Sequence, residues 1–201
     1  MTDVKNSGEL PGLVPVLRGH GLRLCSWDDG SERDVEAWLR GVTDPDFHQW
    51  NTPLKAVEDM AGARESIRSK LAATANGTGA SFRVADAASG TTLGHIAVND
   101  IARLTRCARV GYWVLPEARG QGVATRALAL AARWALTDLG LHRLELGHAL
   151  GHTASCRIAQ RCGFLHEGTL RGAMCEAGRR DAFRDVHLHA RIATDPEPAL
   201  P

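Results

Sequence analysis

The stretch GYWVLPEARGQGVATRALALAARWAL, residues 111–136, decides how this chain folds and what it can bind. A strand-like apolar run ends near Leu115, and Pro116 prevents its continuation because proline has no backbone N–H. A glycine-rich turn follows, and after Gly122 apolar residues recur at helical spacing. The first N–H groups of a helix have no partners within it and lie at the positive end of its dipole. The stretch therefore predicts a strand, a turn and a helix whose N-terminus favours a phosphate.

The turn differs from two other phosphate-binding motifs. The Walker form requires Lys followed by Ser or Thr after its last glycine, and neither stands there. The dinucleotide form fails because Gly120 and Gly122 are followed by Thr125 where a third glycine is required. Glycines let a ligand approach the backbone, and Arg119 and Arg126 add positive charge beside the turn. The alternative to phosphate binding is a tight connection without a ligand.

The rest of the chain alternates between helices and strands. The predicted helices cover residues 31–40 (with Ser31 as cap), 56–73, 123–139 and 154–162. The predicted strands cover residues 81–85, 93–101, 108–115, 143–146, 164–170 and 186–192. In the last strand Val186, Leu188 and Ala190 alternate with polar residues, which predicts one buried and one polar face. The order of elements predicts a single α/β or α+β sandwich.

The composition is that of a globular chain. With 201 residues, 44% of them hydrophobic and 23% charged, it suits one domain. We expect this domain at 16–193, between a flexible N-terminal segment 1–15 and a flexible tail 194–201. The net charge of +1 creates no field that attracts nucleic acid or anionic lipid. A signal peptide and an apolar run of about 20 residues are both absent, so we expect a cytoplasmic protein without membrane partners.

The cysteines and histidines raise the question of a metal site. The chain has five cysteines without a C-x-x-C pair, a pattern typical of free thiols in a reducing compartment. One stretch is nonetheless crowded with possible ligands, namely His142, His148, His152, Cys156 and Cys162. Their spacings match no zinc finger or ribbon. The sequence therefore predicts no metal site.

The turn resembles motif A of the GNAT superfamily of N-acetyltransferases. That motif has Arg or Gln, then Gly three residues later, then Gly or Ala two residues further, and Arg119, Gly122 and Ala124 fill these positions. The wider frame resembles the RimJ and RimL branch of ribosomal-protein N-terminal acetyltransferases. Further segments recur in that branch in the same order, namely LGLHRLEL (139–146), Ser155, Ala159, Gly163 and Phe164, EGTLR (167–171) and DVHL (185–188). The resemblance covers about residues 20–193.

The resemblance implies the GNAT fold, an α+β sandwich. Its central sheet is mixed and mostly antiparallel, has splayed central strands and is flanked by helices. The V-shaped cleft between those strands would hold acetyl-CoA as acyl donor. The pantetheine arm would pair with the main chain of residues 112–114, and the amides of residues 120–125 would hold the pyrophosphate. The implied cofactor-binding residues are Tyr112, Trp113, Val114, Arg119, Gly120, Gln121, Gly122, Val123, Ala124, Thr125, His152 and Ser155.

Two positions depart from the pattern of the relatives. Many of them have an Asn that contacts the CoA arm where this chain has His152, which either replaces that contact or caps the helix. Many also have a Glu, a possible general base, where this chain has Arg109. A cation cannot accept a proton from an ammonium group, so that route is absent. Three other groups could act through water or be structural, namely Asp100, Glu32 and His95.

Ser155 is the predicted catalytic residue. Some members of the family use a Tyr at the position of Ala159 as general acid, whereas the RimL-like branch has a Ser that protonates the departing CoA thiolate. Ser155 stands at that position, although a serine in a first helical turn can instead satisfy helix amides. In this family the region after the first helix lines the acceptor cleft. Trp50 and Asn51, together with Arg109, are therefore the candidates for acceptor contacts.

The predicted function is acetyl transfer from acetyl-CoA to a primary amine, specifically a protein or peptide N-terminal α-amine. The neutral amine attacks the thioester directly, without a covalent enzyme intermediate, and a main-chain N–H near Val114 polarises the carbonyl. A small-molecule acceptor such as an aminoglycoside or polyamine, or another donor such as succinyl-CoA, is the alternative within enzymes. A CoA-binding sensor or scaffold with weak catalysis is the alternative from another class. The resemblance also implies a homodimer.

Overall fold

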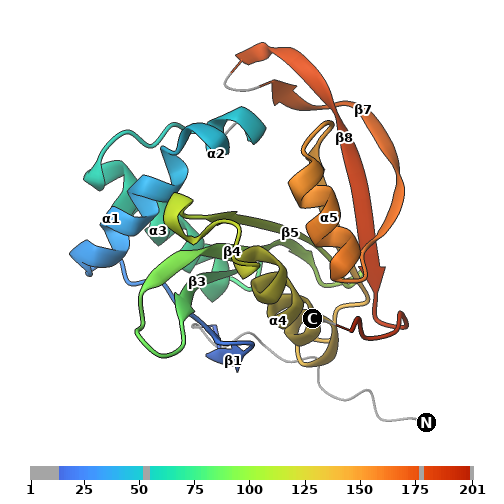
Figure 1. Ribbon diagram of the computed structural model, residues 1–201, viewed down its shortest axis with the longest axis horizontal. Helices are drawn as coiled ribbons and strands as arrows, with labels where there is room; N and C mark the ends of the chain where they lie inside the picture. The colour runs from blue at the N-terminus through green and yellow to red at the C-terminus, as the bar shows by residue number, and fades with distance from the viewer. Residues whose placement is uncertain (1–13, 52–54, 177–178, 200–201) are drawn as a thin grey trace.

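The computed structural model describes residues 14–51, 55–176 and 179–199. Its strands are β1 (Leu17–Gly19), β2 (Leu22–Cys25), β3 (Ala80–Asp86), β4 (Thr92–Ala102), β5 (Cys107–Val114), β6 (Arg143–Ala149), β7 (Leu165–Glu176) and β8 (Arg179–Ile192). Its helices are α1 (Glu32–Val42), α2 (Pro45–Trp50), α3 (Met60–Ala75), α4 (Val123–Thr137) and α5 (Thr153–Arg161), with a 3-10 turn at Pro116–Ala118 (Figure 1).

The strands form one sheet whose centre is splayed. Their order is β1-β2-β3-β4-β5-β6-β8-β7, and β5 and β6 are the one parallel pair in the described part of the chain. These two strands pair only from Cys107–Arg143 to Arg109–Glu145, although β5 continues to Val114. Beyond Arg109 they diverge, so β6 no longer pairs with β5. This mixed, mostly antiparallel sheet with splayed central strands confirms the predicted fold class.

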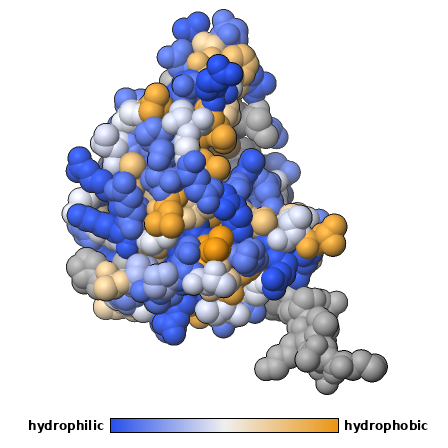
Figure 2. All heavy atoms as spheres, turned by 90° about the vertical axis from the view of Figure 1, so that its right-hand side faces the viewer, coloured by the Kyte–Doolittle hydropathy of each residue, from blue (hydrophilic) through white to orange (hydrophobic). Residues whose placement is uncertain are grey.

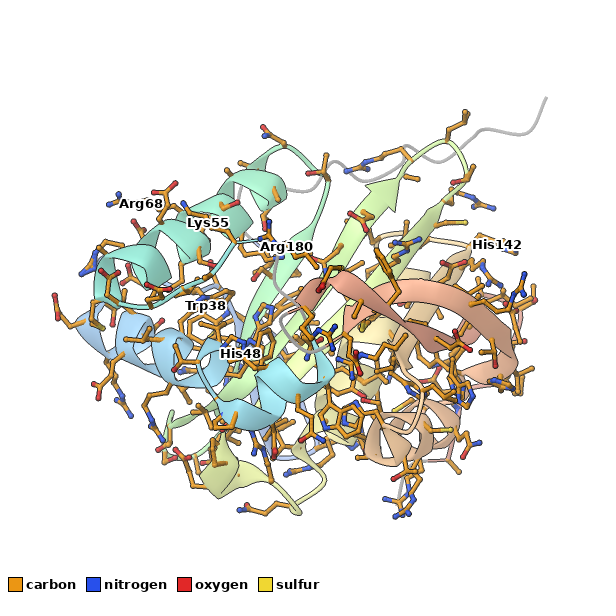
Figure 3. All side chains as sticks on the ribbon, turned by 90° about the horizontal axis from the view of Figure 1, so that it is seen from above. Trp38, His48, Lys55, Arg68, His142 and Arg180 are labelled. Carbon is orange, nitrogen blue, oxygen red and sulfur yellow. The ribbon has the colours of Figure 1, made fainter. Side chains whose placement is uncertain are left out.

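Helices cover both faces of the sheet and enclose two clusters of buried side chains. On one face α4 and α5 pack over the larger cluster, which includes Val110 of β5. On the other face α1 and α3 enclose Trp27, Trp38 and Trp113. Alternate residues of a strand point to opposite faces, so β5 contributes to both clusters. Figure 3 shows Trp38 between α1 and α3, and Trp27, Trp38 and Trp134 are all buried.

Several predicted elements are confirmed and others change. Ser31 caps α1 by accepting a hydrogen bond from the Asp34 amide, as predicted. The second predicted helix begins at Met60 instead of residue 56, because Asp59 accepts from the Gly62 amide and caps it there. The segment after α1, where no helix was predicted, contains the helix α2. The strands β1 and β2 were not predicted, because each is only a few residues long.

The polar face of β8 corrects a prediction. His189 and Arg191 are buried, although their alternation with apolar residues predicted a solvent-exposed face. The helix α5 packs on β6, β7 and β8 and covers this face, so the polar side chains of β8 lie beneath a helix instead of in solvent. The strand pairs with β6 on one side and β7 on the other, which makes it an inner strand of the sheet.

The ends of the chain and its outer surface complete the description of the fold. The flexible segment 1–15 lies almost wholly outside the described residues, and residues 195–199 of the tail form neither helix nor strand. Among the described helices none is long and apolar enough to cross a membrane. On the side of the β7/β8 hairpin, hydrophobic residues lie in separate groups between hydrophilic ones (Figure 2). The homodimer and the domain limits stay predictions.

Candidate functional site

A cleft of about 730 Å³ opens where β5 and β6 diverge. Its walls come from α2, the end of β5, the turn before α4, and α5, and Figure 1 shows α2 and α5 on opposite sides of the opening. A smaller continuation of about 60 Å³ shares Trp50, Tyr112, His152 and Ser155 with the cleft. The predicted site residues that line the cleft are Trp50, Asn51, Tyr112, Trp113, Val114, Arg119, Gly120, Gly122, Val123, Ala124, Thr125, His152 and Ser155.

Two predicted residues lie outside this lining. Gln121 donates its side-chain N–H to the Glu117 carbonyl oxygen, so it stabilises the turn from outside the cleft. Arg109 stands at the other end of β5, where Glu145 and Asp100 are 3.8 Å and 3.9 Å away. The structure therefore does not bring Arg109 to the proposed acceptor region. The sequence pattern placed it on the correct strand but could not show how far along the strand the cleft extends.

The glycine turn requires glycine for its backbone conformation. Gly120 has φ of 73° and Gly122 has φ of 69°, both in the left-handed region that other residues rarely adopt. A side-chain Cβ at either position would meet nothing within 4 Å, so crowding inside the protein is not the reason for glycine. Gly122 is the N-cap of α4 and has no side chain with which to cap it. The first amides of α4 consequently face the cleft without a side-chain cap, as an anion site requires.

Arg119 holds the turn against α2 and contributes little free charge. Its guanidinium donates to the carboxylates of Asp44 and Asp46, and its Nε donates to the Val114 carbonyl oxygen at 3.1 Å. Asp44 is also the N-cap of α2. The sequence predicted that Arg119 adds positive charge beside the turn, but two carboxylates compensate that charge. Arg126 donates to the carbonyl oxygens of His20 and Gln121.

Two arginines that the sequence analysis did not identify line the cleft. Arg157 and Arg161 stand four residues apart on α5, so they project from the same side of that helix. Both are exposed, and neither forms an ion pair within residues 14–51, 55–176 and 179–199. Their spacing was visible in the sequence, but only the packing of α5 across from the turn shows that they face the cleft. They supply the positive charge that Arg119 does not.

A side-chain hydrogen bond joins Tyr112 of β5 to Ser155 of α5. The Tyr112 hydroxyl donates to Ser155 Oγ at 3.1 Å, and Ser155 is buried at the start of α5. Burial raises the pKa of Tyr112 to about 12, so its hydroxyl stays protonated at neutral pH. Because Ser155 Oγ accepts this hydrogen bond, its own proton is free to be donated elsewhere. The sequence assigned only the main chain of Tyr112 to the site and missed this side-chain contact.

His152 lies at the N-cap position of α5 but does not cap it. Its side chain makes no capping hydrogen bond, and its ring stacks on Trp50 with 4.5 Å between centroids. Burial, followed by the neighbouring His148, lowers the pKa of His152 to about 4. Arg184 of β8 lies over the same Trp50 ring and donates to the Gln49 carbonyl oxygen at 2.7 Å. These contacts join α2 to α5 and β8 above the cleft, so the capping alternative for His152 is wrong.

None of the three candidate bases lines the cleft. His95 is buried in the tryptophan cluster, where Trp27 donates to its Nδ1 at 3.1 Å, and burial lowers its pKa to about 3. Glu32 is paired with Arg64 on the outer surface, and Asp100 lies near Arg109. Asp46 is the one carboxylate in the cleft lining among the described residues, and it is held by Arg119. The cleft therefore offers a neutral histidine and no unpaired carboxylate.

A cleft between splayed central strands that ends at a left-handed glycine turn and a helix N-terminus is an arrangement suited to an anionic ligand. The match over residues 28–165 shows that this chain belongs to the family described as acetyltransferase (GNAT) domain. The resemblance stated from the motif is thus confirmed, and the chain is a GNAT-family N-acetyltransferase by its family.

Individual relatives agree with this assignment. The Bacillus subtilis protein YdaF is 32% identical over 85 residues, which are 42% of this chain and 46% of that protein. The ribosomal-protein-serine acetyltransferase of Escherichia coli is 33% identical over 100 residues, which are 50% of this chain and 54% of that protein. The matched segments span about half the length of these curated relatives.

Solved structures share the fold. The structure of RimL, an alpha-N-protein acetyltransferase, in complex with coenzyme A has a TM-score of 0.78 at 19% identity, with 89% of this chain and 98% of that chain covered. Mycobacterium smegmatis RimJ in complex with CoA-disulfide has a TM-score of 0.77 at 24% identity, with 89% and 86% covered. At sequence identities of 19% and 24%, the similarity to these two structures shows a shared fold.

Proposed function

We propose that this protein transfers an acetyl group from acetyl-CoA to the α-amine of a protein or peptide N-terminus. The observation that carries the proposal is the continuity of one cleft from the left-handed turn at Gly120 and Gly122, along the end of β5, to Ser155. That path joins an anion site to a buried hydroxyl, as a cofactor with a pyrophosphate at one end and a thioester at the other requires. The name of the Escherichia coli relative, a ribosomal-protein-serine acetyltransferase, supports a protein acceptor.

Each part of the cleft has a role in this proposal. The amides of residues 120–125 hold the pyrophosphate, with Arg157 and Arg161 nearby as counter-charges. The pantetheine arm lies along residues 112–114 as an added strand, and a main-chain N–H near Val114 polarises the thioester carbonyl. The acceptor enters beside Trp50 and Asn51, where His152 offers a neutral ring.

The reaction proceeds by direct attack. The neutral amine attacks the carbonyl carbon, the C–S bond breaks, and Ser155 donates its proton to the departing thiolate. Ser155 regains a proton from the nitrogen, so the net transfer is one proton from amine to sulfur. Tyr112 is a positioning residue, because its hydrogen bond leaves the Ser155 proton directed at the sulfur.

The first experiment measures thiol release from acetyl-CoA over a panel of acceptors. The panel contains peptides with free N-termini, polyamines and an aminoglycoside, and succinyl-CoA is compared as donor. Turnover with the peptides supports the proposal. Turnover only with the small amines would replace the acceptor class, whereas cofactor binding without turnover would favour the sensor alternative.

The acceptor preference should follow amine basicity. The reference pKa is about 7.7–8.0 for an α-amine and about 10.4 for lysine, so far more of the α-amine is neutral at pH 7. Without an unpaired carboxylate in the cleft, we expect a peptide with a free N-terminus to react faster than its N-blocked, lysine-containing counterpart. The rate should rise about tenfold per pH unit from pH 6 and level off above about pH 8 as the α-amine loses its proton. A preference for the lysine peptide between pH 6 and 9 would contradict the proposal and require a base.

The arginines on α5 should contribute to cofactor affinity through charge. The double variant Arg157→Gln and Arg161→Gln should raise the Kd for acetyl-CoA about twofold to thirtyfold at low salt, because exposed ion pairs contribute about 0.2–1 kcal/mol each. The difference should shrink as salt screens the charges. Arg133→Gln, an exposed arginine of α4 outside the cleft lining, is the matched control. Equal affinities at all salt concentrations would remove both arginines from the cofactor site.

A further inference from the structure

A second cluster of reactive side chains lies under α5, beside the cleft but apart from the groups used for acetyl transfer. It contains His148 of β6, Cys156 of α5, and His187 and His189 of β8. One nitrogen or sulfur atom from each of the four lies within 4.8 Å of the others. His148 and His189 are buried, whereas Cys156 and His187 are half-buried. Two neighbouring elements, β6 and α5, and the more distant β8 therefore bring four side chains of the kinds that bind metals to one point.

The sheet register explains why these histidines meet. His148 is the direct partner of His187 in the antiparallel β6/β8 ladder, so both side chains project from the same face. His189 stands two residues further along β8 and points to that face as well. The helix α5 packs on this face and contributes Cys156. Figure 1 shows α5 beside β8. The arrangement follows from the same packing that buries the polar side of β8.

Within each of the two buried imidazole rings, His148 and His189, the two nitrogen atoms have different environments. The Nδ1 atom of His148 is 3.0 Å from the Ala149 carbonyl oxygen, and the Nδ1 atom of His189 is 3.4 Å from the Phe164 carbonyl oxygen. In each ring the Nε2 atom is buried without a hydrogen-bond partner among the described residues. An unpaired polar atom inside a protein costs about 1–3 kcal/mol. Metal-binding histidines characteristically donate one ring N–H to a carbonyl and leave the other nitrogen for the metal.

We propose that His148, Cys156, His187 and His189 form a closed tetrahedral site for Zn²⁺. Three imidazole nitrogens and one thiolate are ligands that Zn²⁺ prefers, and four protein ligands leave no position for water or substrate. With bonds of about 2.0–2.3 Å, neighbouring ligand atoms of a tetrahedron lie roughly 3.3–3.7 Å apart. The half-buried Cys156 and His187 can rotate inward to reach that spacing. The site is structural, because it would tie α5 to β6 and β8 directly beside Ser155.

This proposal departs from the expectation that the chain has no metal site. The sequence analysis considered His142, His152 and Cys162 with His148 and Cys156 and rejected them on spacing. The structure leaves His142 outside the cluster, at the edge of the molecule (Figure 3). Cys162 donates to the Thr125 carbonyl oxygen at 3.3 Å instead. The two missing ligands come from β8, about thirty residues beyond Cys156, a distance that no short motif describes.

The test measures Zn²⁺ binding by tag-free, full-length protein that has first been stripped with a chelator. We expect one Zn²⁺ per chain by dialysis and elemental analysis, and a melting temperature about 5–10 °C higher when free Zn²⁺ is near 100 times its Kd. Co²⁺ in place of Zn²⁺ should give visible bands of tetrahedral coordination and a near-ultraviolet sulfur-to-metal band. Failure to bind either metal would overturn the proposal, whatever the acetyltransferase assays show.

Single substitutions separate the ligands from neighbouring residues. Cys156→Ser should abolish the sulfur-to-cobalt band, and His187→Gln should weaken Zn²⁺ binding by more than about 100-fold, because even changes to groups that only support ligands cost about 10–100-fold. Cys107→Ser and His142→Gln, which alter a half-buried thiol and an exposed imidazole outside the cluster, should leave binding unchanged. If the control variants lose Zn²⁺ as strongly as the ligand variants, the binding is not at this site. Thermal unfolding of each metal-free variant shows that it still folds.

Discussion

Gly122→Val is expected to abolish acetyl-CoA binding while the protein still folds. The residue has φ of 69°, where a β-branched side chain is strained, and its Cβ would project into open space at the N-terminus of α4. That space is where we place the pyrophosphate, so the valine would displace it from the helix amides. Hydrogen bonds to a charged group contribute about 1.5–3 kcal/mol each, so the loss of two or more corresponds to at least about 100-fold in affinity.

The chain offers a matched control for the backbone strain. Gly140 has φ of 71°, its Cβ would also meet nothing within 4 Å, and it follows the other end of α4. Gly140→Val should therefore cost similar stability, about 1–3 kcal/mol, and leave the affinity for acetyl-CoA unchanged. Calorimetric titration and urea unfolding of both variants separate binding from strain. Wild-type affinity in Gly122→Val would show that the turn does not hold the cofactor.

Ser155→Ala is expected to lower kcat by about 100-fold with little change in the Kd of acetyl-CoA. General acid catalysis raises a reaction rate by about 10²–10⁴-fold. A thiolate is a fair leaving group even without protonation, so we expect the lower end of this range. The substitution removes the acceptor of the Tyr112 hydrogen bond but fits the buried position at the start of α5. Single-turnover measurements isolate the chemical step. An unchanged rate of that step would leave Ser155 with a structural role in the first turn of α5.

Tyr112→Phe tests whether the tyrosine positions the serine. It removes only the hydroxyl that donates to Ser155 Oγ, so we expect a loss of roughly tenfold in kcat, in line with about 0.5–1.5 kcal/mol for one hydrogen bond. The effects of Tyr112→Phe and Ser155→Ala should not add, because the first acts through the second. Additive losses would show that Tyr112 acts separately from Ser155. Cofactor affinity should stay near that of the wild type in both variants.

The helices and inner strands could be predicted because their signals are local. Ser31 and the apolar spacing after it define α1, and the proline and glycines of residues 116–122 define the break between β5 and α4. The short strands β1 and β2 and the short helix α2 escaped prediction, since a few residues cannot establish a period. All the predicted residues of the turn except Gln121 line one cleft, because the turn is built within a single segment.

By itself, the sequence determined the family through its motifs, and it determined the longer helices and strands and the place of the glycine turn, because caps, proline, glycine and apolar periodicity act between residues close along the chain. Only the tertiary structure showed which distant side chains meet. It paired Arg119 with Asp44 and Asp46, placed Tyr112 against Ser155, and removed Arg109 and His95 from the cleft. It also buried the polar side of β8 beneath α5. Such contacts depend on strand register and on where a helix lies across the sheet, and neither is encoded by the spacing of residues within one segment.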